Sequence, residues 1–235
     1  MILEAILFRG ALPRGNAAGI LGTNDRHARR VVDCKARQIT LLEVFYYEQD
    51  SFSGRSMRVL EPTDLPHYTH KDYLRWEGRW ELLDGIAYAM TPAPSIVHQR
   101  ISQKIARLLD ESLENCEQCV ALLPVDWKIT EDTIVQPDNL VVCYQPSGSY
   151  LTRAPSLIFE ILSASTRSKD EKIKFRLYET ESVLYYCLVD PDEKIIKIFL
   201  LTDGRYIKQI DARTETFQFD LSECQITFDC SKVWV

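Results

Sequence analysis

The chain has 235 residues, of which 46% are hydrophobic and 26% are charged, so it can bury a hydrophobic core of ordinary size. Its apolar runs are too short to cross a bilayer, and its N-terminus lacks the basic region and the cleavage site of a secretory signal, so we expect a cytoplasmic protein. The formal net charge of −6 argues against tight, non-specific binding to DNA, because such binding depends on basic surfaces.

Residues 1–56 differ in character from the rest of the chain. They carry 8 Lys and Arg against 6 Asp and Glu, whereas the remaining residues carry 20 against 28. Turn-forming residues are frequent in this segment, and only residues 39–47 suggest a short strand or helical turn. We predict that translation begins at Met57 and that residues 1–56 are non-native upstream sequence. The alternative is a genuine but disordered N-terminal extension.

The next part of the chain predicts a helix, a hairpin and a second helix. Thr69 has the position of an N-cap for a short helix. The Asp84-Gly85 pair lies between two apolar runs, which is typical of a two-residue hairpin turn. Ser95 is a candidate N-cap for a longer amphipathic helix to about Leu113, because apolar residues recur behind it at helical spacing.

Most of the later chain predicts strands. The run over residues 156–162 is apolar apart from one glutamate, as expected of a central strand that is buried on both faces. Ser168 and Glu171 have the spacing of a capping box, which predicts a helix to about residue 180. Together these elements predict a single mixed α/β domain. The other expected strands cover residues 120–124, 126–130, 139–143, 184–189, 195–201 and 206–210.

Seven cysteines are spread along the chain. In a reducing cytoplasm we expect them to serve as small buried hydrophobic residues. Cys116 and Cys119 have the spacing of half a zinc site, but no second Cys-x-x-Cys or His-x-x-x-His pair accompanies them, and Cys224 and Cys230 are six residues apart. We therefore interpret the Cys-x-x-Cys spacing as incidental and expect no zinc site.

Two acidic residues interrupt apolar strands. Glu160 lies in the segment Leu-Ile-Phe-Glu-Ile-Leu, where an isolated ionised carboxylate would cost several kcal/mol and would shift its pKa. Asp138 lies at the start of another apolar strand. Two carboxylates side by side supply the oxygen ligands that Mg²⁺ prefers, and a cation held there can activate a water for phosphodiester cleavage.

Lys174 lies on the predicted helix that follows the Glu160 strand. An ammonium group near the metal can orient or deprotonate the attacking water, or balance developing negative charge. The spacing also fits an ordinary surface pair between Asp170 and Lys174, worth about 0.2–0.5 kcal/mol. Spacing alone favours the surface pair for Lys174, whereas the apolar surroundings of Glu160 favour a functional role for that residue.

These residues belong to a series of motifs that follow one another in a fixed order. The series comprises Trp80-Glu-Leu-Leu-Asp-Gly85, Pro92-x-Pro-Ser-x-x-His98, Pro137-Asp138, Pro155-Ser-Leu-Ile-Phe-Glu-Ile-Leu-Ser163, Asp170-x-x-x-Lys174-x-x-x-Tyr178 and Tyr185-Tyr-Cys-Leu-Val-Asp-Pro191. Over about residues 68–210 the chain resembles the Uma2 family, also called DUF820, which is abundant in cyanobacteria. The resemblance implies a restriction endonuclease-like mixed sheet flanked by helices, with a PD-(D/E)xK-type active site.

The resemblance assigns roles to individual positions. Asp138 and Glu160 match the two metal-binding acids of the family. Leu162 stands where the lysine of the general nuclease pattern would be, and the resemblance transfers that catalytic role to Lys174. This departure makes the lysine the least typical part of the expected site.

Two further residues, Glu81 and His98, remain open to two interpretations, and three basic residues lie near Lys174 in the sequence. Glu81 precedes the hairpin turn and is either a further ligand or base of the site or an ordinary hairpin glutamate. His98 falls on the apolar face of its helix, so a packed, capping histidine is at least as good an interpretation as a catalytic one. Arg167, Lys169 and Lys172 form a small basic cluster that could meet nucleic-acid phosphates.

From these features we predict an endonuclease that hydrolyses phosphodiester bonds in DNA with Mg²⁺ or Mn²⁺. The resemblance also implies a homodimer, because duplex cleavage by this fold generally uses two active sites. Two alternatives remain: an inactive binding or assembly module of the same fold, and a metal-dependent phosphoesterase that acts on small substrates.

Overall fold

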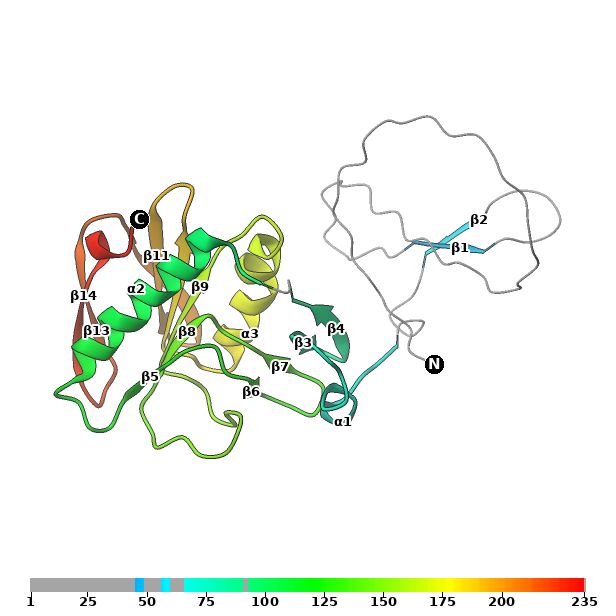
Figure 1. Ribbon diagram of the computed structural model, residues 1–235, viewed down its shortest axis with the longest axis horizontal. Helices are drawn as coiled ribbons and strands as arrows, with labels where there is room; N and C mark the ends of the chain where they lie inside the picture. The colour runs from blue at the N-terminus through cyan, green and yellow to red at the C-terminus, as the bar shows by residue number, and fades with distance from the viewer. Residues whose placement is uncertain (1–44, 49–55, 60–65, 91–92, 235) are drawn as a thin grey trace. The chain divides into compact units, whose positions relative to one another are not determined.

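The computed structural model describes residues 45–48, 56–59, 66–90 and 93–234, and it divides the chain into two units at Pro66 (Figure 1). In the first unit, β1 (Phe45–Glu48) pairs antiparallel with β2 (Ser56–Val59). Met57 lies in β2, and the start of translation there stays a prediction. Residues 1–44, which make up most of the predicted extension, lie outside the described residues.

The second unit is built on a six-stranded mixed sheet. In order across the sheet its strands are β12 (Arg205–Ala212), β11 (Ile195–Thr202), β10 (Tyr185–Asp190), β9 (Leu157–Ile161), β8 (Asn139–Val142) and β5 (Val120–Leu122). Strands β9 and β10 run parallel, and every other neighbouring pair is antiparallel. The predicted central strand is confirmed, because β9 is buried along its whole length.

Two smaller sheets and several helices complete this unit. A four-stranded sheet has the order β4 (Ile86–Ala89), β3 (Trp80–Leu83), β7 (Ile134–Val135) and β6 (Trp127–Lys128). A separate hairpin joins β13 (Thr216–Asp220) to β14 (Gln225–Asp229). The helices are α1 (His70–Tyr73), α2 (Ile96–Leu113), the π-helix η2 (Lys169–Lys174), α3 (Phe175–Thr180) and the 3₁₀-helix η3 (Cys230–Lys232).

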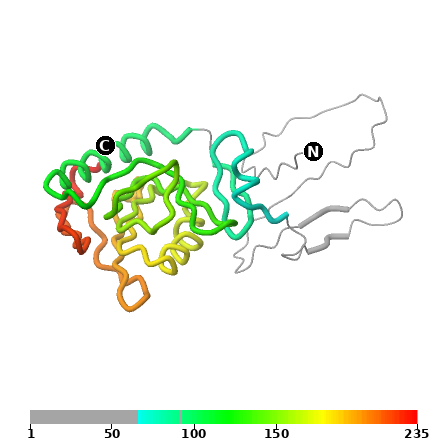
Figure 2. The backbone as a smooth tube through the Cα atoms, turned by 90° about the horizontal axis from the view of Figure 1, so that it is seen from below, coloured from blue at the N-terminus to red at the C-terminus, as the bar shows by residue number. Residues whose placement is uncertain are grey.

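The two faces of the large sheet pack against different elements. Leu157 and Phe159 of β9 belong to a core that contains the buried side of α2 and of the β13–β14 hairpin. Ile158 and Leu162 belong to a second core, shared with α3 and the four-stranded sheet. Figures 1 and 2 accordingly show α2 and α3 on opposite sides of the strands. Because successive side chains of a strand point to opposite faces, Glu160 lies on the α3 side.

Several local expectations are confirmed by the turns and caps. Asp84 and Gly85 have φ values of 48° and 77°, so both residues of the hairpin turn adopt the left-handed conformation that a type I′ turn requires. Ser95 caps α2, since its side chain accepts a hydrogen bond from the backbone N–H of His98 over 3.2 Å. The predicted mixed α/β unit, with helices flanking the sheet, is therefore confirmed.

Two expectations about local structure are wrong. Ser168 makes no side-chain cap, and the segment after it begins as the π-helix η2 in place of the predicted α-helix. The predicted strands also ended at residue 210, whereas β13 and β14 follow later. No helix in the described part of the chain is long and apolar enough to cross a membrane.

The expectation that the cysteines are unpaired buried residues is wrong for four of them. Cys116 is joined to Cys224 and Cys119 to Cys143 by disulfides. Among the described residues, two cysteines remain as buried thiols, and these are Cys187 and Cys230. The chain therefore ties the β13–β14 hairpin covalently to the turn after α2.

The β13–β14 hairpin should depend on its aromatic contacts with β9. Phe228 is 1% exposed, and its ring centroid lies 5.1 Å from that of Phe159. We expect Phe228→Ala to lower the free energy of unfolding by about 3–5 kcal/mol, because it leaves a cavity in the core. The control is Ile207→Ala on β12, where the side chain is 51% exposed and should change stability by less than about 1 kcal/mol. Equal losses in urea unfolding would contradict this account of the hairpin.

Candidate active site

The pairing of β8 with β9 brings Asp138 and Glu160 together. Asn139 faces Phe159 in the antiparallel register, so the position before Asn139 lies opposite the position after Phe159. Asp138 is further held by the backbone N–H of Ile161, which donates to its Oδ2 atom over 2.9 Å. The two predicted acids are therefore neighbours across adjacent strands.

Glu160 lies in a nearly closed environment, with only 3% of the residue exposed. Its Oε1 atom accepts two hydrogen bonds of 2.8 Å, from Lys174 Nζ and from the Tyr178 hydroxyl. Burial raises the pKa of Glu160 to about 8; the Lys174 ammonium opposes this increase, and neighbouring carboxylates add to it. The carboxyl group therefore depends on a cation close by, here the Lys174 ammonium group, to stay ionised.

Lys174 is buried, and the expectation of an ordinary surface pair with Asp170 is wrong. The residue is 2% exposed, and its Nζ atom lies 2.7 Å from Glu81 Oε1 and 2.8 Å from Glu160 Oε1, compared with 3.7 Å from Asp170 Oδ1. Burial lowers the pKa of Lys174, but these carboxylates raise it by more, so it stays well above its ordinary value. The side chain is a fixed cation that cannot take up a proton.

The π-helix η2 places this lysine. A π-helix has wider turns than an α-helix, and such segments occur frequently at functional sites. Asp170 and Lys174 are the two buried residues of η2, and Tyr178 follows one turn later on α3. From the sequence we expected Asp170 to form only a surface pair, and we assigned no role to Tyr178. The signal was nevertheless present, because Asp170, Lys174 and Tyr178 follow one another at intervals of four residues and so share one helix face.

Glu81 belongs to the same cluster. It is fully buried on β3, where its Oε1 atom accepts the backbone N–H of Gln136 over 3.1 Å and its Oε2 atom pairs with Lys169. Burial raises the pKa of Glu81, but Lys174 and Lys169 lower it by more, to about 2. Glu81 is therefore an ionised anchor for two lysines, which excludes the interpretation as an ordinary hairpin glutamate.

His98 reaches the candidate site from α2. Its Nε2 atom lies 3.1 Å from Asp138 Oδ2, and the two side chains are 17% and 14% exposed. Both residues line a groove of about 760 Å³ beside α2, together with Arg79 and Arg107. The structure thus gives the histidine a polar partner in the site, and the groove gives Asp138 a connection to solvent.

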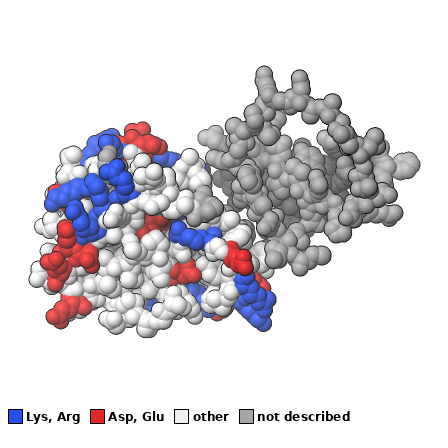
Figure 3. Space-filling view, in the orientation of Figure 1, with Lys and Arg blue, Asp and Glu red and all other residues white. Residues whose placement is uncertain are grey.

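The three basic residues proposed to meet phosphates have different surroundings. Arg167 donates to Asp190 over 2.7 Å, and Lys169 is paired with Glu81. Lys172 is exposed. Figure 3 shows positive and negative side chains in neighbouring patches on the face that carries α2. A nucleic-acid role for the cluster stays a prediction, and Lys172 is the residue best placed for it.

The acid pair has the oxygen atoms that a divalent cation needs. Among the described residues, hydrogen bonds involve Asp138 Oδ2 and Glu160 Oε1, and none involves Asp138 Oδ1 or Glu160 Oε2. A Mg²⁺ ion typically keeps several waters and binds through one or two carboxylates. The two carboxylates therefore fit such an ion. Among the described residues, no group of three acidic or histidine side chains lies close enough together there to share one ion.

Comparisons with known proteins concern the family and the fold of the chain. The sequence profile of the Uma2 family, described as "Putative restriction endonuclease", matches residues 70–227. An "Uncharacterized protein slr1290" of Synechocystis is 32% identical over 149 residues, which are 59% of this chain and 77% of that protein. A crystal structure from Anabaena variabilis, titled as "a putative nuclease belonging to DUF820", is similar with a TM-score of 0.58 and 16% identity, over 71% of this chain and 97% of that chain. The last similarity confirms the fold.

Glu81 should make the protein's stability sensitive to acid. Its pKa is about 2 in the folded chain and 4.5 as the ordinary value, so its stabilising contribution is complete above about pH 4.5 and is lost as the pH falls towards 2. This contribution is on the order of 3 kcal/mol. We expect Glu81→Gln to flatten the decrease in unfolding free energy between pH 5 and pH 2, measured by urea titration. The exposed Glu117→Gln controls for the loss of one charge, and an unchanged slope in Glu81→Gln would refute the ion pairing.

Proposed function

We propose a nuclease function from one premise: the chain belongs to the Uma2 family. The family's description and the fold shared with a DUF820 protein support a restriction endonuclease-like protein that cleaves phosphodiester bonds. We further propose that the substrate is DNA and that Mg²⁺ or Mn²⁺ is the cofactor. The cytoplasmic location and the homodimer expected from the sequence remain part of this proposal.

One observation carries the proposal: two carboxylates lie side by side with a buried ammonium group bound to one of them. Asp138 and Glu160 each keep one oxygen free of hydrogen bonds within the described chain, and Lys174 is 2.8 Å from the other oxygen of Glu160. A cation bound there supplies an activated water and neutralises charge on the phosphate. A buried ion pair between Lys174 and Glu160 that served stability alone would not need Asp138 beside it.

The surrounding residues hold this arrangement in place. Tyr178 and Lys174 both donate to Oε1 of Glu160, which leaves Oε2 without a hydrogen bond among the described residues. Glu81 fixes the position of Lys174 from the opposite side. Because the Nζ atom of Lys174 lies between Glu81 and Glu160, we assign this residue to electrostatic stabilisation of the site.

The groove beside α2 is the proposed path for the substrate. It reaches Asp138 and His98, and Arg79, Arg107 and Asp110 also line it, so a phosphate backbone in the groove would meet arginine side chains as it approaches Asp138.

A second candidate function has its own supporting observation. Lys169, Lys174 and Arg167 are all paired with acids, and the whole chain has a net charge of −6, so little positive charge remains for duplex DNA. These features favour a metal-dependent phosphoesterase for small substrates, or a module of this fold that binds without turnover.

Removal of one acid should abolish activity while leaving the fold intact. We expect wild-type protein to nick plasmid DNA with Mg²⁺ or Mn²⁺, and we expect Asp138→Asn to be slower by at least about 100-fold, because a cation ligand is lost. The matched control is Asp203→Asn, an exposed acid in the turn between β11 and β12 that does not line the groove and should leave cleavage unchanged.

The outcomes separate the candidates. Equal cleavage by wild type and Asp138→Asn would show that a contaminant cleaves the DNA, and the assignment would fall. Calorimetric uptake of Mn²⁺ by wild type without DNA cleavage would replace the nuclease with the small-substrate phosphoesterase. Absence of both uptake and cleavage would leave the binding module.

A further inference from the structure

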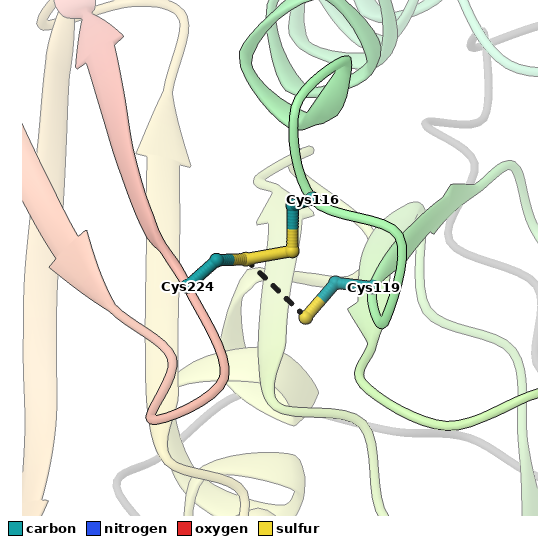
Figure 4. A group of neighbouring side chains, drawn as sticks. All are labelled: Cys116, Cys119 and Cys224. Carbon is teal, nitrogen blue, oxygen red and sulfur yellow. Dashed lines mark hydrogen bonds between the residues drawn. A yellow bond between two sulfur atoms is a disulfide. The ribbon is translucent and has the colours of Figure 1, made fainter.

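Four cysteines from three distant parts of the chain meet at one point. Cys116 and Cys119 flank the turn between α2 and β5, Cys143 follows β8, and Cys224 precedes β14. Figure 4 shows three of these side chains pointing towards one another. We propose that, when reduced, these four cysteines bind one Zn²⁺ ion as a structural site.

The distances place three of the sulfurs in one cluster, and the fourth is bonded to one of them. The Sγ atoms of Cys116, Cys119 and Cys224 lie within 4.8 Å of one another, and Cys143 is bonded to Cys119. Cys119 and Cys224 belong to different disulfides, yet their sulfurs are only 3.5 Å apart.

The strand register explains the approach of the middle pair. Val120 of β5 faces Val142 of β8 in an antiparallel ladder, so the next position outward on each strand brings Cys119 opposite Cys143. The Cα atoms of these two cysteines are 3.9 Å apart. The sheet itself therefore fixes two of the four ligands, and the turn after α2 and the β13–β14 connection supply the others.

This geometry suits a tetrahedral zinc site. A Zn–S bond of about 2.3 Å corresponds to sulfur–sulfur separations of about 3.8 Å, close to the 3.5 Å already present between the two disulfides. Cys116 and Cys119 have the Cys-x-x-Cys spacing that is common in structural zinc sites. Cys143 and Cys224 complete the set of four ligands, although neither belongs to a second Cys-x-x-Cys motif.

The change from disulfides to a zinc site is chemically balanced. Four molecules of a cellular monothiol reduce the two disulfides, leave as two oxidised disulfide molecules, and return four cysteine thiols to the protein. Binding of one Zn²⁺ then converts the four thiols to thiolates and releases four protons.

Such an ion would stabilise the C-terminal part of the fold. A two-stranded hairpin is only marginally stable alone, and β13–β14 lies outside the six-stranded sheet. The zinc would fasten this hairpin to α2 and to the sheet without a disulfide. The site is also distinct from Asp138 and Glu160, because thiolates select zinc whereas carboxylates suit Mg²⁺.

The test is a cobalt and zinc titration of reduced full-length protein. We would reduce the chain with a phosphine under inert gas, remove metals, and titrate with Co²⁺, whose absorption spectrum reports tetrahedral thiolate coordination. We expect one Co²⁺ per chain, displaced by one Zn²⁺. The Cys143→Ser and Cys224→Ser variants should bind at least about 100-fold more weakly. Cys230→Ala removes a buried thiol outside the cluster and should bind like wild type.

Two results would overturn the proposal. One is reduced wild-type protein that stays folded by circular dichroism and gives no tetrahedral thiolate spectrum. The other is a Cys143→Ser variant that binds as tightly as wild type. Asp138→Asn should keep the cobalt spectrum, so failure at the cysteine site and failure at the acidic site are separate outcomes.

Discussion

The buried ammonium group of Lys174 is the constraint on which the site depends. A charge that is 2% exposed costs several kcal/mol unless close partners compensate for it, and the removal of one partner leaves the other charge unpaired. Glu160 and Glu81 are those partners, and they come from β9 and β3. Lys174 therefore links the π-helix η2 to both sheets, and its position determines how the side chains of Glu81 and Glu160 are oriented.

This arrangement leaves one oxygen of each carboxylate, in Asp138 and in Glu160, without a hydrogen bond among the described residues. Lys174 and Tyr178 occupy one oxygen of Glu160, and the backbone of β9 and His98 occupy one oxygen of Asp138. The remaining oxygens are held by side chains that cannot turn away without breaking these bonds. A pre-organised pair of carboxylates that is half satisfied by the protein suits a cation better than it suits a structural network, in which every oxygen is paired.

Local patterns in the sequence predicted much of the fold and part of the site. The hairpin at Asp84-Gly85, helix α2 and strand β9 each follow from turn chemistry or hydrophobic period, and the acids stood out against apolar strands. The burial of Lys174 could not be predicted, because it also depends on Glu81, which comes from β3, far earlier in the chain. The meeting of the four cysteines could not be predicted either, because Cys116 and Cys224 are separated by 108 positions in the chain.

The most direct test of the acidic site is a crystal structure of wild-type protein soaked in Mn²⁺, with the ion located by its anomalous scattering. We predict one manganese peak bound by Asp138 Oδ1 and Glu160 Oε2, with Lys174 still bonded to the other oxygen of Glu160. A well-ordered site without manganese at these two carboxylates, at concentrations that saturate other sites, would contradict the account.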